Sequence, residues 1–382
     1  MIPGDGIGVE VMAEAVKALT AVADSSGKAL ALTPFDWGAD RYLKTGVSLP
    51  QGALGMLQDG FDAILLGAMG DPRVPDNTHA ADILLGLRSK LDLFVNYRPI
   101  KLLHEKLCPL KGATAEDVDF VVFRENTEGA YVMMGGNFKK DTPDEVATDV
   151  DLNTRKGVER IIRHAFAFAR SRGRKRVCMA DKSNVLIHAH DLWQRVFKAV
   201  AAEFPDIEAR HLYVDNLALQ LVRDPKQFDV IVTSNMFGDI VSDLAAGLQG
   251  GLGMAASGNI HPGRLSLFEP VHGSSPPLAG RNVANPFGAI LTAGLMLEQL
   301  GWAEEAQRLE SAVRWAVLAD NTTADLGGAL GTREVGDAVV GRLLASRGCP
   351  ATSLSRLASA SSSSPKTPAS YASSSAESWT FR

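Results

Sequence analysis

The stretch Phe228–Asp243, FDVIVTSNMFGDIVSD, joins an apolar strand-like run to a segment that carries two acids. Asp239 and Asp243 are four residues apart, so on a helix their carboxylates share one face and destabilise it by about 0.2–0.5 kcal/mol. A bound Mg²⁺ or Mn²⁺ would turn this repulsion into a pair of ligands, since both ions prefer carboxylate oxygens. A solvated acidic face is the simpler interpretation of these two carboxylates. The positions of the remaining charged residues distinguish it from a metal site.

Outward from this stretch, short β-branched runs alternate with longer amphipathic ones. Such alternation predicts an α/β fold with a mixed, mostly parallel sheet. The strand-like runs include residues 62–67, 119–125, 176–181, 210–215 and 229–235, and the helical runs include residues 9–25, 154–171, 190–204 and 286–301.

Charged residues follow four successive strand-like runs directly. Arg124 follows the first, Lys182 the second, Asp215 the third, and Asp239 and Asp243 come shortly after the fourth. Ligands of open α/β sheets bind in the crevice beyond the carboxyl ends of the strands. The pattern therefore predicts one shared, charged crevice rather than four independent surface charges.

A second group of charges lies in LLGLRSKLDLFVNYRP, which contains Arg88 and Arg98. If residues 81–93 are helical, Leu84, Leu85 and Arg88 share one face. The leucines can equally be plain core, but an inward arginine is rarely buried without a partner. A guanidinium fork suits a carboxylate, so Arg88, Arg98 and Arg124 together predict a site for a dicarboxylic acid.

Composition excludes several classes of protein. The chain has 382 residues, of which 46% are hydrophobic and 22% charged, which is typical of a globular protein with two domains or one large α/β unit. A net charge of −5 provides no basic surface for nucleic acid or membrane, and no apolar run is as long as a membrane span. The start lacks a signal-peptide pattern, and the three scattered cysteines fit reduced thiols, so we expect a cytoplasmic protein.

The two ends of the chain are unusual. Residues 351–382 are rich in Ser, Ala and Pro, and this composition predicts a disordered tail. Met1–Pro3 leads straight into the turn Gly4–Gly8 with little room for a strand, so we expect either a start further upstream or a domain that lacks most of one strand. The turn is not GxGxxG and predicts no dinucleotide site by itself.

Two other glycine-containing turns are candidates for ligand contact. Gly67 begins a loop that permits close backbone approach, although many ordinary turns look the same. His272-Gly273-Ser274 is a small polar turn flanked by prolines, in which backbone N–H groups can approach a phosphate.

In combination, these pieces resemble the β-decarboxylating dehydrogenases of (R)-2-hydroxy acids, which include isopropylmalate, isocitrate, homoisocitrate and tartrate/D-malate dehydrogenases. The resemblance runs from Pro3 to about Leu344. It is carried by PGDGIG, LLGLR, NYRP, RENTEGAY (124–131), DKSNVL (181–186), YVD (213–215), SNMFGDIVSD (234–243), EPVHGS (269–274), ANP (284–286) and DLGG (325–328).

The resemblance implies a two-domain fold of the isopropylmalate dehydrogenase type, not a Rossmann fold. Residues 1–95 plus 250–345 would form a cofactor-side domain. Residues 96–249 would form the substrate, metal and dimerisation domain, with an intersubunit clasp near residues 132–150.

The resemblance also implies a role for each candidate site residue. Tyr131 would protonate the enol after CO₂ leaves, and Lys182, from the other subunit of a homodimer, would assist proton removal from the C2 hydroxyl. The remaining roles are substrate binding by Leu84, Leu85, Arg88, Arg98 and Arg124, binding of Mg²⁺ or Mn²⁺ by Asp239 and Asp243 with Asp215 of the other subunit, and NAD binding by Gly67, His272, Gly273, Ser274, Asn285 and Asp325.

Within the family, LLGLR and DKSNVL look most like 3-isopropylmalate dehydrogenase. This implies NAD- and metal-dependent oxidative decarboxylation of 3-isopropylmalate to 4-methyl-2-oxopentanoate in leucine biosynthesis. Burying an isopropyl group against Leu84 and Leu85 is worth roughly 2–3 kcal/mol, which argues against isocitrate but only weakly against D-malate or tartrate. The alternatives are therefore a tartrate/D-malate or NAD-isocitrate dehydrogenase, and a catalytically silent structural subunit.

Three positions bear on the cofactor. Ala81 stands where isopropylmalate dehydrogenases usually carry a glutamate, and Pro277 stands where NAD-using members usually carry an aspartate. No partner for a 2′-phosphate is evident at Pro277-Leu278, which favours NAD, while Arg281 leaves NADP open.

Overall fold

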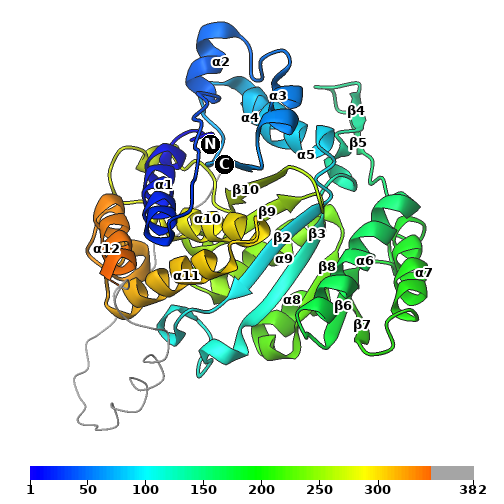
Figure 1. Ribbon diagram of the computed structural model, residues 1–382. Helices are drawn as coiled ribbons and strands as arrows, with labels where there is room; N and C mark the ends of the chain where they lie inside the picture. The colour runs from blue at the N-terminus through cyan, green and yellow to red at the C-terminus, as the bar shows by residue number, and fades with distance from the viewer. Residues whose placement is uncertain (346–382) are drawn as a thin grey trace, which may run out of the picture. The chain divides into compact units, whose positions relative to one another are not determined.

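One eight-stranded mixed sheet organises residues 1–345, which are the residues that this computed structural model describes (Figure 1). The strand order is β1-β10-β9-β2-β3-β8-β6-β7. The pairs β1–β10, β3–β8, β8–β6 and β6–β7 are parallel and the other three are antiparallel, which confirms the predicted mixed, mostly parallel sheet. The predicted disordered tail and Cys349 lie outside the described residues.

The strands agree closely with the apolar runs of the sequence. The run at 176–181 is a strand along its whole length, while the run at 210–215 begins earlier and ends two residues sooner than expected. The bounds are β1 Ala63–Leu65, β2 Val95–Lys101, β3 Asp119–Glu125, β6 Arg176–Asp181, β7 Glu208–Tyr213, β8 Val230–Thr233, β9 Ala256–Ile260 and β10 Ser266–Pro270.

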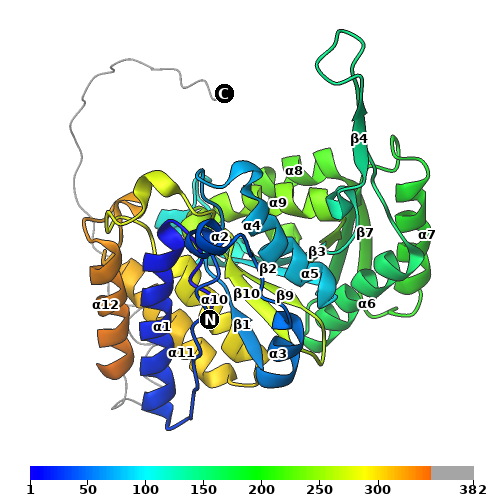
Figure 2. The same cartoon turned by 90° about the horizontal axis from the view of Figure 1, so that it is seen from above.

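Helices cover both faces of this sheet. The core on one face includes α1, α10, α11 and α12 beside α6 and α7, and a second core packs α8 and α9 against the opposite face (Figures 1 and 2). The longer helices are α1 Ile7–Ser26, α6 Arg155–Ser171, α7 Ala189–Ala201, α8 Val214–Arg223, α9 Asn235–Leu248, α10 Phe287–Gln299, α11 Ala303–Leu318 and α12 Thr332–Ala345. The shorter ones are α2 Ala39–Thr45, α3 Ala53–Gly60, α4 Thr78–Ala80 and α5 Gly86–Lys90.

The N-terminal segment contributes a single β-bridge to the sheet. Ile2 pairs in parallel with Leu66, and its backbone N–H donates to the carbonyl of Leu65 at 2.9 Å. The chain then turns at Gly4, whose φ of 77° and distance of 2.1 Å from a built Cβ to the Ala68 oxygen require glycine. The glycines of this turn thus allow close packing on the loop after β1.

The predicted boundary between the two domains coincides with the antiparallel β9–β2 pair. Because the sheet continues across this boundary and residues 1–345 form one compact unit, the division stays a prediction. A separate hairpin, β4 Gly135–Phe138 and β5 Val146–Asp149, projects from the body where the clasp is expected (Figure 2). Within residues 1–345, no helix combines the length and apolarity needed to cross a membrane.

Candidate active site

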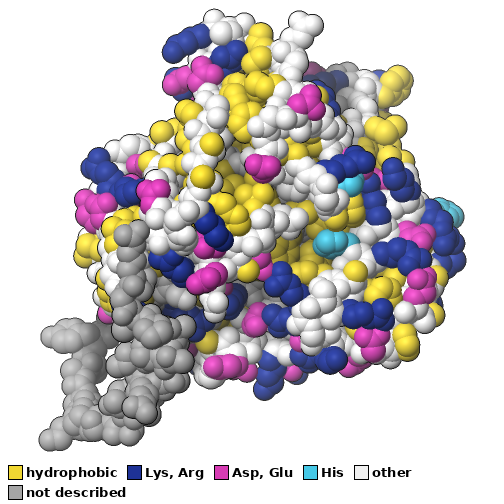
Figure 3. All heavy atoms as spheres, in the orientation of Figure 1, with side chains coloured by type: hydrophobic (Ala, Val, Ile, Leu, Met, Phe, Trp, Pro, Cys, Tyr) yellow, Lys and Arg dark blue, Asp and Glu magenta, His cyan; other side chains and the backbone are white. Residues whose placement is uncertain are grey.

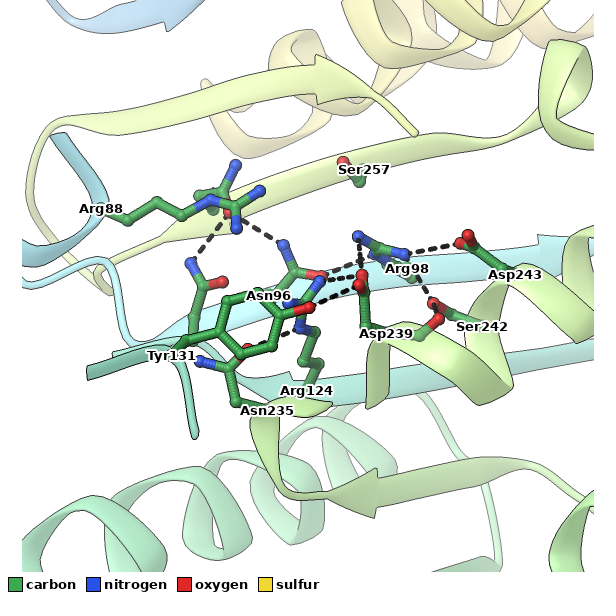
Figure 4. Close-up of polar contacts among 12 residues, drawn as sticks. Arg88, Asn96, Arg98, Arg124, Tyr131, Asn235, Asp239, Ser242, Asp243 and Ser257 are labelled. Carbon is green, nitrogen blue, oxygen red and sulfur yellow. Dashed lines mark hydrogen bonds and ion pairs between the residues drawn. The ribbon is translucent and has the colours of Figure 1, made fainter. Parts of the chain in front are cut away.

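Three buried arginines line one face of the central strands. Arg98 comes from β2, Arg124 from β3 and Arg88 from α5, and each is at most 7% exposed. The helix α9, which follows β8, brings Asp239 and Asp243 to them (Figure 4). The structure therefore assembles the three arginines that the sequence singled out and places the acid pair beside them, one helical turn apart.

Arg98 lies between the two acids of α9. Its Nη1 donates to Ser242 Oγ at 2.6 Å and to Asp243 Oδ1 at 3.1 Å, while Nη2 lies 3.2 Å from Asp239 Oδ1 (Figure 4). Its Nε donates to Asn96 Oδ1 at 2.8 Å. A cation thus already separates the two carboxylates and relieves the repulsion expected from their spacing.

Arg124 packs directly against the first turn of α9. Its Nε donates to Asn235 Oδ1 at 2.9 Å, and its Nη1 donates to Asp239. This approach requires glycine at position 238, because a Cβ there would lie 2.5 Å from the Arg124 side chain. Gly238 is therefore part of the geometry of the site, although it carries no chemistry of its own.

Two of the arginines have unused hydrogen-bonding capacity. Arg88 Nη2 donates to Glu269 Oε1 at 2.6 Å, but its Nε is buried and has no partner among residues 1–345. The same holds for Nη2 of Arg124. Buried donors without partners are costly, at about 1–3 kcal/mol each and more for charged groups. The two orphan nitrogens indicate that the cluster is completed by an anion.

The electrostatic environment of the cluster favours an ionised Asp239. Burial tends to raise the pKa of Asp239, but Arg124 and Arg98 outweigh it and hold the pKa below its usual range. Burial raises the pKa of Asp243, and Arg98 only partly opposes this effect. For Arg124, burial and the neighbouring arginines lower the pKa to about 10. The three arginines would therefore gain from a bound anion.

Tyr131 belongs to the same cluster. Its hydroxyl donates to Asp239 Oδ2 at 2.7 Å, and its ring lies 4.8 Å from the guanidinium carbon of Arg124 (Figure 4). Burial and the bond to Asp239 raise the pKa of Tyr131. The hydroxyl therefore holds its proton at neutral pH and can act only as an acid or a neutral donor.

A buried amide network supports Arg88, and the sequence analysis missed it. Glu269 accepts hydrogen bonds from Arg88 and from Asn259 Nδ2, the latter at 2.8 Å. Asn259 Oδ1 in turn accepts from Asn96 at 2.8 Å and Asn126 at 2.9 Å. Asn96 lies within NYRP and Glu269 within EPVHGS, so membership of these motifs was the only sign of a role for them. Nothing in the order of the residues showed that they meet.

Leu84 and Leu85 lie on the helical segment that carries Arg88. The helix predicted over residues 81–93 is present but runs from Thr78 to Lys90, and residues 81–85 form a π-helical turn within it. Ile83 and Leu87 take the core positions, while both leucines remain half-buried. The plain-core interpretation therefore applies to these neighbours and in part to Leu84, which packs against the same core, whereas Leu85 is half-buried outside that core.

Lys182 and Asp215 form a second, separate pair. Lys182 follows β6, and its Nζ lies 2.5 Å from Asp215 Oδ1 on the surface. Asp215 does not close a strand as we expected, because β7 ends at Tyr213 and Asp215 lies in the first turn of α8. The bond to Lys182 lowers the pKa of Asp215.

The expected single crevice is thus split into two groups within one chain. In the described part of the chain, no group of three or more His, Cys, Asp or Glu side chains lies close enough to hold a metal ion. A metal set made of Asp215, Asp239 and Asp243 would need Asp215 from another subunit, which is what the resemblance implies. That arrangement stays a prediction.

The candidate cofactor turn combines an open glycine with an unpartnered histidine nitrogen. A Cβ at Gly273 would touch nothing within 4 Å. His272 is buried, burial lowers its pKa, and its Nε2 has no partner in residues 1–345. The carbonyl of Ser274 accepts from Ile7 N at 2.8 Å, which ties the turn to the start of α1.

The other candidate cofactor residues divide into two kinds. Asn285 Nδ2 donates to Asp325 Oδ2 at 3.0 Å, so Asn285 of ANP pairs with Asp325 of DLGG. At Gly67, in contrast, a Cβ would lie 1.9 Å from the Pro3 oxygen. Close packing on the N-terminal segment therefore accounts for the glycine at position 67 without any ligand.

Comparison with known proteins agrees with this geometry. A sequence model of the isocitrate/isopropylmalate dehydrogenase family matches residues 1–339. The 3-isopropylmalate dehydrogenase of Thermobifida fusca is 46% identical over 345 residues, which cover 90% of this chain and 96% of that protein. The corresponding enzyme of Streptomyces griseus is 48% identical, covering 90% and 97%.

A solved structure extends the agreement to three dimensions. The crystal structure of isocitrate dehydrogenase from Methylococcus capsulatus superimposes with a TM-score of 0.81 at 37% sequence identity, covering 90% of this chain and 98% of that one. A family match over nearly the whole chain, together with relatives above 45% identity, establishes the assignment. The chain belongs to the isocitrate/isopropylmalate dehydrogenase family.

Proposed function

We propose that this protein is a 3-isopropylmalate dehydrogenase, which oxidatively decarboxylates 3-isopropylmalate to 4-methyl-2-oxopentanoate in leucine biosynthesis. The observation that carries the proposal is the arginine cluster, with orphan nitrogens on Arg88 and Arg124 beside half-buried Leu84 and Leu85. Buried guanidinium groups can donate paired hydrogen bonds to the carboxylates of a diacid, and adjacent leucines provide apolar surface for its isopropyl group. Relatives that carry this enzyme name cover most of the chain.

A divalent metal fits the donor set of α9. Asp239 and Asp243 offer carboxylate oxygens one helical turn apart, and Asp215 from a partner subunit would complete the set. Such an ion acts as a Lewis acid on the substrate oxygen. NAD fits the turn at His272–Ser274, where Gly273 is open and the buried His272 Nε2 lacks a partner among the described residues. When bound there, NAD would supply the acceptor for the hydride that leaves C2 of the substrate.

The side chains of the chain divide the remaining work. Arg88, Arg98 and Arg124 orient the diacid, and Lys182 of the partner subunit assists removal of the proton from the C2 hydroxyl. Loss of CO₂ then leaves an electron pair on the neighbouring carbon. Tyr131, whose raised pKa keeps its hydroxyl protonated, supplies a proton to that carbon. The proton released from the hydroxyl balances the one that Tyr131 delivers.

A homodimer is part of the proposal because Lys182 and Asp215 lie apart from Asp239. Exposed apolar side chains on the β4–β5 hairpin, including Phe138 and Val146, supply surface for the expected clasp. Apolar residues of this size at the tip of a projecting hairpin are typical of a subunit contact. Reduced Cys108 and Cys178 are compatible with the cytoplasm that we expect as the compartment.

Steady-state kinetics with four substrates test the proposal. With NAD and Mn²⁺, kcat/KM should be highest for 3-isopropylmalate and roughly 30–100-fold lower for D-malate, because the isopropyl group contributes about 2–3 kcal/mol. Tartrate and isocitrate complete the series. Equal or better kcat/KM on D-malate would make this a malate enzyme, and absence of turnover in a folded dimer would point to a structural subunit.

A matched variant makes the substrate comparison sharper. Leu85→Ala should reduce kcat/KM for 3-isopropylmalate while leaving the value for D-malate nearly unchanged, since only the former has an isopropyl group to bury. Leu43→Ala, at an exposed position of α2, is the control for a leucine truncation that touches no substrate.

A further inference from the structure

A cavity of about 500 Å³ lies on the opposite face of the central strands from the arginine cluster. Its walls come from β2, β3, α10, α11 and the end of α6. Figure 3 shows a hollow near the middle of this face, with hydrophobic side chains inside and side chains of both charges around it. The volume falls within the range of about 300–1,000 Å³ that is typical of small-molecule sites.

The alternation of β2 separates this cavity from the proposed active site. Tyr97, Pro99 and Lys101 line the cavity, whereas Asn96 and Arg98 point into the cluster on the other face. The two sites therefore share a strand but no lining side chain. A ligand in the cavity would lie directly behind the residues that hold the substrate arginines.

The inner wall offers two hydrogen-bond donors that nothing in residues 1–345 uses. Gln249 is 4% exposed, and its Oε1 accepts from Lys101 N at 2.8 Å, but its Nε2 has no partner. Tyr97 makes no hydrogen bond through its hydroxyl in the described residues, and burial raises its pKa, so it remains a donor. A buried amide N–H without a partner calls for an acceptor on a ligand.

The rest of the interior is apolar, and the rim is electrically balanced. Phe168, Met254 and Leu295 supply apolar surface. At the rim, each cation has its own acid: Lys101 with Glu310 at 2.6 Å, Arg172 with Glu298 at 2.5 Å and Arg174 with Asp119 at 2.7 Å. A rim without net charge does not attract a dianion or a dinucleotide. It suits a small molecule with at most one uncompensated charge.

We propose that this cavity is a second ligand site, which takes a small monocarboxylate with an apolar body. The apolar part occupies the space between Tyr97, Phe168 and Leu295, and the carboxylate accepts hydrogen bonds from Gln249 Nε2 and the Tyr97 hydroxyl. Such a ligand is either a simple acid or an amino acid. An amino acid would add an ammonium group, which the rim acids Glu298 and Glu310 can receive.

Direct binding tests the site without reference to catalysis. Calorimetric titration of the full chain with 4-methylpentanoate, L-leucine and isoamylamine compares the same apolar body with a carboxylate, with both charges and with an ammonium alone. We expect saturable binding of at least one carboxylate at one site per chain, and weaker binding of the amine. The stronger of the two carboxylates identifies the source as simple acid or amino acid. No binding of either carboxylate would overturn the proposal.

Two substitutions place the ligand. Gly294→Met fills the space between α10 and α11, where a Cβ would meet no atom closer than 3.8 Å, and should abolish binding. Gln249→Glu keeps the acceptor for Lys101 N–H but replaces the free donor with an acceptor, and should weaken carboxylates by roughly tenfold to a hundredfold. Gly294→Ala is the matched control for folding. Binding that survives both substitutions would place the ligand elsewhere, for example at the arginine cluster, and the proposal would fail.

Discussion

The arginine cluster and the Lys182–Asp215 pair contrast sharply, although both draw residues from the parallel strands β3, β8, β6 and β7 or from the segments that follow them. The arginines of the cluster are buried and come from several elements, and Asp239 alone contacts Arg98, Arg124 and Tyr131. The pair is exposed, with the Asp215 side chain 65% accessible, and its members bond chiefly to each other. The arginine cluster is nearly complete within one chain. The Lys182–Asp215 pair is an ordered ion pair, but it lies apart from that cluster.

In the proposed homodimer, this contrast marks the part of the site that the second subunit would supply. Within the described residues, Lys182 forms its ion pair with Asp215 rather than with an acid of the arginine cluster. In a twofold dimer the same surface meets its copy, so the exposed pair of one subunit can complete the cluster of the other.

Removing the charge of Asp239 should have the largest effect. Asp239→Asn leaves Arg98 and Arg124 without their shared acid and leaves one acceptor oxygen where these arginines and the Tyr131 hydroxyl had two. Because breaking one partner of a buried charge pair costs about 2–5 kcal/mol, kcat/KM should fall by roughly 30-fold to several thousandfold. Ser242→Ala, which removes one hydrogen bond that Arg98 donates to a neutral acceptor, should lower it by only about tenfold. Similar losses in both variants would contradict the central role of Asp239.

Mixing two inactive variants tests whether subunits share sites. Lys182→Met and Asp239→Asn should each be nearly inactive alone. After subunit exchange, about half of the dimers are mixed and one of their two sites is intact, so about a quarter of wild-type activity should return. Turnover of the mixture, with exchange verified by mass spectrometry of tagged chains, is the measurement. Verified mixed dimers that remain inactive would show that each chain uses its own Lys182.

The pH dependence of stability reports on the opposite face of the sheet. Burial lowers the pKa of His164, which packs on Phe123 under β3, from 6.5 to about 4. Above pH 6.5 the ring is neutral in both states. Below that pH the unfolded chain takes up a proton that the folded chain refuses, so stability should fall as the pH drops from about 6.5 towards 4.

The control for this prediction is His164→Leu, which cannot titrate. Urea unfolding midpoints at a series of pH values should decline less steeply for the variant than for the wild type. Parallel curves would mean that His164 is protonated as readily in the folded protein as in the unfolded one.

The smallest expected effect is on stability at the exposed pair. Lys182→Met should change the free energy of unfolding by about 1 kcal/mol or less, since surface ion pairs contribute little. Denaturant unfolding at low protein concentration measures it. A loss of several kcal/mol would show that Lys182 supports the fold, and its catalytic assignment would then need another test.

Local order along the chain was readable from the sequence because hydrophobic periodicity is itself local. The run 176–181 is a strand along its whole length, and the acid pair lies on a helix as its spacing implied. The resemblance identified the family and supplied most of the candidate site residues, since residues with chemical roles occur in short contiguous motifs. Asp215 was misplaced at a strand end because the step from Tyr213 into α8 leaves no break in the apolar pattern.

What only the tertiary structure decided is which distant residues meet. Three different strands contribute Asn96, Asn259 and Glu269. The amides are neutral, so no charge pattern in the sequence predicts that they share a network. The cavity behind Tyr97 likewise exists only because α10, α11 and α6 leave space over β2. The order of residues by itself determined the elements, the family and the chemical groups. Packing decided burial and partners, because both depend on contacts between segments more than a hundred residues apart.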